Sequence, residues 1–358
     1  MTVKHHIQST AHRYYKKFEI KDHNLLYLFL EITRKCNLKC LHCGSDCIAD
    51  AQSPELTTDS WLKIIDYFCE RYSPELTFVI TGGEPLVHKD MITIVTRIKN
   101  NNRRWGMVSN GMALNPEKFK ALVDAGLYSI TLSIDGLENA HNKLRNNPIA
   151  FNKAITALEI VGKSALKFKD AVTCVYPDNL NQLNAVAELL VDKGITSWRL
   201  FRIFPSGRAE NNASIQLSFS QTQQMLDWIK TNKPVYAERG LNINLSCEGW
   251  LPFSEDKQLR DEPFFCRAGV NIASVLCDGH ITGCSNNDKS FYRGNILNDD
   301  FSYVWENNFN DFRQREWTSN TVCNDCEHVK ECMAGSIHLW NFGEKKPKFC
   351  YAKEIITL

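Results

Sequence analysis

Six strand-like runs, each followed by a helical pattern, occupy residues 26 to about 230 and constrain the fold more than any other feature of the chain. The runs are rich in β-branched and aromatic residues. The expected strands are 26–33, 76–81, 103–109, 128–134, 168–176 and 197–204, and the expected helices are 58–72, 88–101, 115–125, 148–163, 180–193 and 219–231. Strict alternation indicates parallel strands joined by right-handed crossovers. Because a closed barrel needs eight units, we predict an α/β fold with an open, partial (β/α)6 barrel.

The composition changes after about residue 236. From there the chain has short elements, many Asn, Asp and Gly residues, and eight of its 14 cysteines. We therefore predict an N-terminal extension at 1–25, a barrel at 26–235 and a small cysteine-rich domain at 236–358.

The charge balance excludes some partners. With 42 basic and 41 acidic residues the net charge is +1, so neither nucleic acid nor a membrane surface is an expected partner. The chain has no apolar run long enough to span a membrane, and its first residues lack the apolar core of a secretion signal. We expect a cytoplasmic protein, in which disulfides are rare and clustered thiols are typically metal or cluster ligands.

A compact cysteine loop follows the first expected strand. Cys36, Cys40 and Cys43 have the spacing C-x3-C-x2-C, with Cys47 shortly after. Structural zinc sites usually pair cysteines across a longer gap. Three thiolates in one loop can instead hold three corners of a [4Fe–4S] cube and leave the fourth iron open to a ligand. We interpret Cys47 as a bystander.

Three further turns complete a pattern with this loop. "TGGEP" (81–85), "SNG" (109–111) and "SIDG" (133–136) follow the second, third and fourth expected strands. With the cysteine loop, this order resembles that of the radical S-adenosylmethionine (SAM) enzymes, which have a partial, TIM-like barrel. The resemblance implies that the open iron binds the amino and carboxylate groups of SAM. Reductive cleavage of SAM then gives a 5′-deoxyadenosyl radical, which abstracts a hydrogen atom from the substrate.

The resemblance also implies a set of SAM contacts: Gly82, Gly83, Glu84, Asn110, Ser133, Asp135 and Arg145. Glu84 would accept a hydrogen bond from the methionine ammonium, and Arg145 would pair with the carboxylate. Ser133 and Asp135 suit the ribose hydroxyls, and the glycines allow close backbone approach. His42 occupies an aromatic-or-His position next to the cluster.

The C-terminal cysteines resemble the SPASM extension of radical SAM enzymes, which carries two auxiliary [4Fe–4S] clusters. Cys266 and Cys284, with Gly279 between them, fit the first part of that pattern. The four thiols implied for the distal auxiliary cluster are Cys323, Cys326, Cys332 and Cys350. Zinc is the alternative for this C-x2-C-x5-C spacing.

One position departs from the SPASM pattern. Its sixth cysteine is Ser336 here, which removes a thiol from the auxiliary cluster nearer the barrel. Cys247 and Cys277 are both candidates to replace it. A serine ligand is disfavoured because a hydroxyl is far less acidic than a thiol. An open iron is the other alternative. Of the remaining cysteines, Cys69 and Cys174 are expected to pack in the core.

SPASM enzymes mostly modify peptides or proteins, so the resemblance implies a peptide maturase that makes a crosslink or an oxidation. Alternatives are a sulfatase-maturase-like formylglycine oxidase, a small-molecule radical dehydrogenase and a non-enzymatic iron–sulfur electron carrier. Expected partners are a peptide or protein substrate and a reductase such as flavodoxin or ferredoxin. No catalytic residue is assigned; Asp278 is a weak candidate base, and candidate substrate contacts are Arg199, Arg202 and Arg208. The sequence leaves the oligomeric state open.

Overall fold

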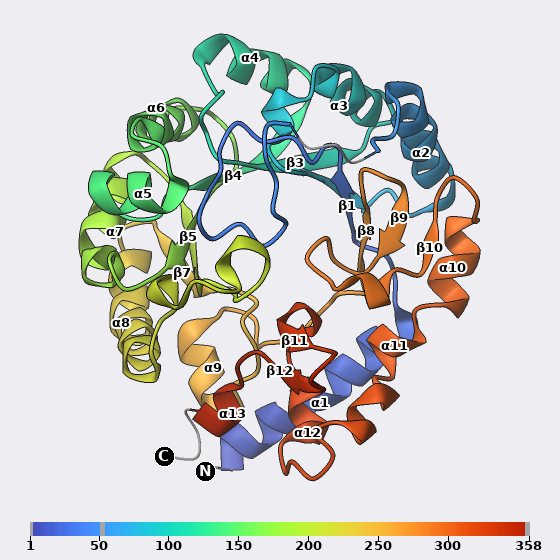
Figure 1. Cartoon of the computed structure of the whole chain (residues 1–358), viewed down its shortest axis with the longest axis vertical. Coiled ribbons are helices and arrows are strands. Elements are labelled where there is room, and N and C mark those ends of the chain that lie inside the picture. The colour runs from blue at the N-terminus through green and yellow to red at the C-terminus, as the bar shows by residue number, and fades with distance from the viewer. Residues whose placement is uncertain (1–2, 51–53, 355–358) are drawn as a thin grey trace.

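The computed structural model describes residues 3–50 and 54–354, which form a curved sheet surrounded by helices (Figure 1). In this part of the chain the main sheet has ten strands in the order β10-β9-β8-β1-β2-β3-β4-β5-β6-β7. The strands are β1 Tyr27–Glu31, β2 Thr77–Thr81, β3 Arg104–Ser109, β4 Leu127–Ser133, β5 Phe168–Val175, β6 Ser197–Arg202, β7 Asn242–Leu245, β8 Ile272–Val275, β9 His280–Thr282 and β10 Gly294–Asn295. A separate pair is formed by β11 Trp340–Asn341 and β12 Lys346–Pro347.

Helices connect and cover these strands. They are α1 Val3–Asp22, α2 Thr58–Arg71, α3 Met91–Asn100, α4 Pro116–Asp124, α5 Glu138–Arg145, α6 Ala150–Gly162, α7 Leu183–Asp192, α8 Phe219–Ala237, α9 Phe253–Leu259, α10 Phe301–Asn307, α11 Asn310–Arg313, α12 Val329–Cys332 and α13 Tyr351–Glu354. Polar residues precede several of these helices and accept hydrogen bonds from backbone N–H groups of the first turn. Thr57 and Asn115 cap α2 and α4 through side-chain oxygens, and Ser218 forms a capping box with Gln221 at α8.

The predicted α/β class and partial barrel are confirmed. Strands β1 to β7 pair in parallel and in chain order, and the helices lie outside them (Figure 1). The sheet is longer than the six expected strands. β7 extends it beyond β6, and β8 pairs in parallel with β1 at the opposite edge, so residues after 236 belong to the same sheet. The domain boundaries at 25 and 235 stay predictions.

Alternation along each strand separates a packed face from an open one. Leu30, Ile80 and Leu132 are at most 1% exposed and pack in the helix-covered core. Their neighbours Glu31 and Thr81 point to the opposite, inner face, because successive side chains of a strand alternate. The inner face therefore has polar residues where these strands end.

The first helix lies against the C-terminal part of the chain. α1 runs beside α11 and α12 (Figure 1). Its Lys16 Nζ donates a hydrogen bond of 2.7 Å to the Glu331 carbonyl, and its Glu19 accepts from Asn271 at 2.7 Å and pairs with Arg267 at 3.3 Å. Among the described residues, none of the helices is long and apolar enough to cross a membrane.

Candidate functional site

A cavity of about 160 Å³ lies where β1 to β4 end. Its lining includes most of the residues that the sequence singled out, namely Cys36, Cys40, His42, Cys43, Cys47, Gly82, Gly83, Glu84, Asn110, Ser133 and Arg145. Parallel strands bring these distant segments together because their carboxyl ends share one edge of the sheet. Asp135 is not part of the lining.

Two of the cavity residues donate to the cysteine sulfurs. Asn110 Nδ2 lies 3.8 Å from Cys36 Sγ, and Arg145 Nη1 lies 3.8 Å from Cys40 Sγ. N–H donors directed at sulfur stabilise thiolates and, in iron–sulfur proteins, help set the reduction potential. Three thiols on one wall, donors to two of them and an open polar space beside them suit a cluster that keeps one iron accessible. The observed side chains therefore fit a three-cysteine [4Fe–4S] cluster with SAM beside it.

Asp135 has a different environment from the one expected. Its Oδ2 accepts a hydrogen bond of 2.6 Å from Arg145 Nε, and its Oδ1 accepts one of 2.8 Å from the Cys174 backbone N–H. Burial alone would raise the pKa of Asp135, but Arg145, His42, His141 and the Cys174 N–H together outweigh it and hold that pKa below its usual value. In this arrangement Asp135 orients Arg145 toward the cavity. Both its oxygens are engaged within the protein, and its contact with the SAM ribose stays a prediction.

His42 lies in the same buried group. A nitrogen of His42, a carboxylate oxygen of Asp135 and the Cys174 sulfur lie within 4.8 Å of one another. Burial lowers the pKa of His42 to about 4, so its imidazole is neutral at pH 7. Cys174 is 8% exposed, consistent with the expected core position.

Glu84 joins the second and third strand ends. Its Oε2 accepts a hydrogen bond of 2.7 Å from the Asn110 backbone N–H, and its Oε1 accepts from Ser109 Oγ at 2.9 Å and the Leu86 N–H at 3.1 Å. The side chain is only 1% exposed. Burial raises the pKa of Glu84, while these donors favour the charged form. Glu84 is thus a structural acceptor as well as a cavity residue.

Replacing Glu84 with glutamine tests that structural role. The amide nitrogen of Gln would face at least one of the three donors, leaving a buried N–H or O–H unpaired. We expect the free energy of unfolding to fall by about 1–3 kcal/mol, measured by chemical denaturation. A matched Glu117→Gln change on the exposed surface of α4 should leave it unchanged within about 0.5 kcal/mol. Equal unfolding curves for both variants would contradict the assignment.

The two glycines of "GGEP" allow a close approach within the protein itself. A Cβ on Gly83 would lie 2.3 Å from the Lys35 carbonyl oxygen, and one on Gly82, where φ is +151°, would lie 2.4 Å from that of Thr33. The backbone N–H groups of Gly83 and Glu84 donate to these same carbonyls at 2.8 and 2.9 Å. The glycines therefore attach the second strand end to the start of the cysteine loop, in addition to lining the cavity.

Arg208 supports the cysteine loop from the other side. Its Nε donates to the Cys40 carbonyl at 2.7 Å and its Nη2 to the Cys47 carbonyl at 3.1 Å. Cys47 is 3% exposed, and its Sγ lies 3.8 Å from the Ser45 carbonyl. Of the arginines considered as substrate contacts, Arg208 thus binds the loop.

The other two arginines differ from each other. Arg202 is buried, with its guanidinium 3.4 Å from the centre of the Phe349 ring. Arg199 lies on the inner face of β6, where Nη2 donates to Asp170 Oδ2 at 2.6 Å and to Thr131 Oγ1 at 3.1 Å. Arg199 therefore faces the inside of the barrel, and Arg208 also lines the cavity at the strand ends.

Glu31 was not identified from the sequence as a site residue. It ends β1 on the inner face and is 7% exposed, and burial raises its pKa to about 7. A carboxyl group that titrates near neutrality suits proton transfer. The only signal in the sequence is an acidic residue within the apolar run "LYLFLEIT". Asp278, the earlier candidate base, lies 2.9 Å from His280 Nδ1.

The C-terminal cysteines form two groups. In the first, desolvation and then the neighbouring Cys266 raise the pKa of Cys247, which is an exposed residue, and burial with Cys247 and Cys266 raises that of Cys284 to about 12. These three thiols therefore lie near one another. Ser336 lies beside them, because its Oγ donates to the Cys247 carbonyl at 2.8 Å. Cys277 is elsewhere: burial and Glu31 raise its pKa.

The second group contains the thiols implied for the distal cluster. Burial has the largest effect on Cys323 and Cys332 and raises the pKa of both thiols, and Cys350 raises both further. Cys326 also raises the pKa of Cys323. Three of these residues line one small cavity, namely Cys323, Cys332 and Cys350. All four sulfurs are free thiols, which leaves them available to a cluster or to zinc.

Comparison with known proteins agrees with this geometry. Residues 30–190 match the family model of the radical SAM superfamily, and residues 266–327 match that of the SPASM iron–sulfur cluster-binding domain. The chain is 26% identical over 317 residues to an AdoMet-dependent heme synthase of Nitratidesulfovibrio vulgaris, covering 84% of each protein. It is 28% identical over 314 residues to the mycofactocin maturase MftC of Mycolicibacterium smegmatis, covering 85% of this chain and 76% of the relative.

The fold also has a solved counterpart. The structure of Streptococcus suis SuiB bound to S-adenosylmethionine superposes with a TM-score of 0.69 at 17% identity, over 92% of this chain and 78% of SuiB. The matched domains imply SAM and [4Fe–4S] clusters as cofactors. The chain is therefore an enzyme of the radical SAM superfamily with a C-terminal SPASM domain.

Proposed function

We propose that this enzyme cleaves SAM reductively and abstracts a hydrogen atom from a peptide or protein, giving a crosslink or an oxidation in peptide maturation. When bound, the cluster and SAM supply the 5′-deoxyadenosyl radical. The observation that carries the radical chemistry is the cavity at the ends of β1 to β4, where three cysteines have N–H donors to two of their sulfurs. Similarity to MftC, named a maturase, supports a peptide substrate.

In this proposal the chain's own residues have separate tasks. Cys36, Cys40 and Cys43 hold the SAM-binding cluster, and Asp135 positions Arg145 at the edge of the cavity. Ser133 and Asn110 line the cavity that we propose for SAM. On the inner face, Glu31 is the candidate proton acceptor, and the Arg199–Asp170 pair offers charged contacts to a substrate. The two acidic residues proposed to act inside the barrel, Glu31 and Asp170, thus lie on β1 and β5.

The auxiliary clusters would take up the electron that is released when a substrate radical is oxidised. We assign Cys247, Cys266 and Cys284 to the cluster nearer the barrel, and Cys323, Cys326, Cys332 and Cys350 to the distal one. A reductase such as flavodoxin or ferredoxin would supply the first electron.

A second candidate function is the synthesis or conversion of an iron porphyrin. It is favoured by the relatives named AdoMet-dependent heme synthase and Fe-coproporphyrin III synthase, the latter 25% identical over 296 residues. Both functions require the same radical chemistry, so the radical SAM step does not separate them.

The test is anaerobic incubation of the reconstituted enzyme with SAM and dithionite. Formation of 5′-deoxyadenosine is expected, and its absence from fully iron-loaded protein would overturn the radical proposal. A second incubation offers either a peptide panel or iron coproporphyrin, and both mixtures are analysed by mass spectrometry. A crosslinked peptide loses two hydrogens, about 2 Da. A change confined to the porphyrin would replace the peptide assignment with the second candidate.

A further inference from the structure

A groove of about 580 Å³ lies between α1 and the segment that contains α10, α11 and α12. In Figure 1 α1 crosses this part of the molecule beside α11 and α12. The cationic side chains that line it are Arg13, Lys16, Lys17, Lys21, Arg313 and Lys330. Neither the peptide-maturase proposal nor the porphyrin alternative uses this surface.

The charge of the groove is strongly one-sided. Glu306 is the one acidic residue among its described lining, and its carboxylate already lies 2.9 Å from His23 Nε2. The whole chain has a net charge of only +1, so six cations in one groove are a local concentration and do not reflect a basic protein. Such a surface attracts anions and speeds the approach of acidic molecules.

A buried arginine forms part of this groove. Arg313 is 4% exposed, its Nε donates to the Gly269 carbonyl at 2.9 Å, and its guanidinium stacks 4.7 Å from the centre of the Trp305 ring. Its Nη2 has no hydrogen-bond partner among the described residues. A buried, unpaired guanidinium N–H is costly unless an acceptor reaches it. The buried Arg313 guanidinium therefore adds to the positive charge of the groove wall.

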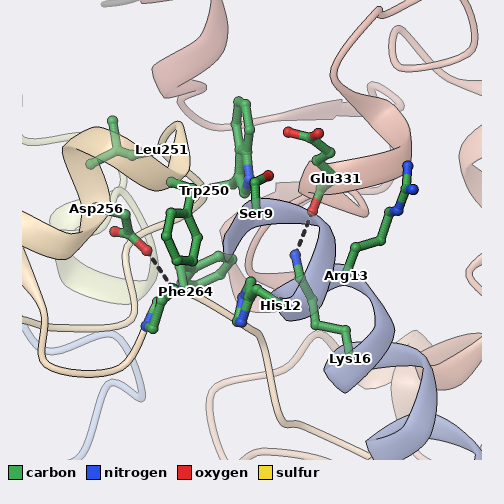
Figure 2. A pocket seen from close by; sticks show the side chains of 11 residues that line it. Ser9, His12, Arg13, Lys16, Trp250, Leu251, Asp256, Phe264 and Glu331 are labelled. Carbon is green, nitrogen blue, oxygen red and sulfur yellow. Dashed lines mark hydrogen bonds between the residues drawn. The ribbon is translucent and has the colours of Figure 1, made fainter. Parts of the chain in front are cut away.

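The groove adjoins the cysteines assigned to the distal cluster. Its residues Lys330 and Met333 flank Cys332 in the chain. Figure 2 shows Lys16 reaching from α1 to the Glu331 carbonyl, one residue before Cys332, with Arg13 on the same part of the helix. A molecule bound in the groove would lie near the distal cluster.

The size of the charged surface bears on the kind of ligand. Arg13, Lys17 and Lys21 follow one another at four-residue intervals and span about 12 Å along one side of α1. Lys330 lies across the groove on α12. This spread exceeds a single phosphate or carboxylate and suits several carboxylates on a protein surface. Nearness to a redox centre favours an electron carrier over an acidic peptide, which gains nothing from that position.

We propose that this groove is the docking surface for an acidic, one-electron carrier protein, which exchanges electrons with the distal auxiliary cluster. One electron would pass between the carrier and a cluster held by these cysteines, in either direction, so that the donor is oxidised and the acceptor reduced by one electron, with no bond formed or broken. The inference rests on the proposed function, because it requires a cluster at Cys323, Cys326, Cys332 and Cys350.

The experiment measures binding of a purified, acidic flavodoxin to the cluster-loaded enzyme at low salt. Charge reversal of three exposed groove residues, Lys17→Glu, Lys21→Glu and Lys330→Glu, is expected to weaken the affinity roughly tenfold or more. The matched control reverses three exposed lysines on the outer helices, Lys63→Glu, Lys118→Glu and Lys153→Glu, with the same change in net charge. The control should retain the native affinity. Raising the salt concentration to about 300 mM should remove most of the difference.

Electron exchange is read separately, by stopped-flow absorbance of the reduced flavin after mixing with enzyme that lacks SAM. The groove variant should slow flavin oxidation at subsaturating enzyme, whereas the control should not. Equal affinity of native enzyme and groove variant would overturn the proposal, as would equal weakening by the control. Displacement of flavodoxin by a polyglutamate peptide with no change in flavin oxidation would overturn the electron-carrier assignment. Iron content and 5′-deoxyadenosine, measured on the same samples, show independently whether the proposed function fails.

Discussion

A Cys40→Ala variant is expected to lose SAM cleavage altogether and to contain about four fewer iron atoms than the native enzyme. Cys40 is 7% exposed, lines the cavity at the strand ends, and accepts from Arg145 Nη1 at 3.8 Å. Removing one of three thiolates leaves a cluster with two open irons, which is unstable. The measurements are iron content after anaerobic reconstitution and 5′-deoxyadenosine by chromatography.

Cys47→Ala is the matched control for this prediction. Cys47 belongs to the same loop and is equally buried, but its Sγ is directed at the Ser45 carbonyl. We expect this variant to retain the cluster and SAM cleavage within about twofold of native. If Cys47→Ala lost the cluster as Cys40→Ala does, four protein ligands would be needed, and no iron would remain for SAM.

Cys247→Ala is expected to remove the auxiliary cluster nearer the barrel, again about four iron atoms, while SAM cleavage continues. The reason is the grouping of its thiol with those of Cys266 and Cys284, so that Cys247 supplies one of three thiols to this cluster. Iron content and the electron paramagnetic resonance spectrum of the reduced enzyme report the loss. The cavity at the ends of β1 to β4 is formed by other residues, so 5′-deoxyadenosine should still appear.

Two further variants are compared with Cys247→Ala. Cys277→Ala should keep all the iron, because the Cys277 thiol is buried beside Glu31 and not beside the other cluster cysteines. Ser336→Cys should place a fourth thiol beside the group, since Ser336 Oγ is 2.8 Å from the Cys247 carbonyl, and should make the cluster more resistant to chelators. Full iron retention in Cys247→Ala together with iron loss in Cys277→Ala would reverse the assignment.

Much of the barrel could be predicted from the sequence because local patterns determine it. Apolar, β-branched runs with turn residues after them gave the first six strands within two residues at each end. The motif residues could also be placed, since parallel strands present their carboxyl ends at one edge. Patterns of this kind act over a few residues and need no knowledge of the rest of the chain.

The features that could not be predicted depend on tertiary contacts. β8 has four residues and only gains its identity by pairing with β1, and α5 is a short, mostly polar helix. The environment of Asp135 follows from the direction of Arg145, which spacing alone does not report. Tertiary contacts also decide whether Cys247 or Cys277 belongs to the auxiliary cluster nearer the barrel. Both lie near Cys266 in the sequence, but Cys266 acts on the pKa of Cys247, whereas Glu31 and Asp278 act on that of Cys277.

The pairing of β1 with β8 has a consequence for the order of events during synthesis. β1 leaves the ribosome well before one of its two neighbours, which lies some 240 residues later in the chain, at Ile272–Val275. α1 can form its tertiary contacts only later still, because they include Glu331. Until then the nascent barrel has an open strand edge, the kind of surface that pairs with other chains. The C-terminal third therefore completes the barrel as well as carrying the auxiliary cysteines.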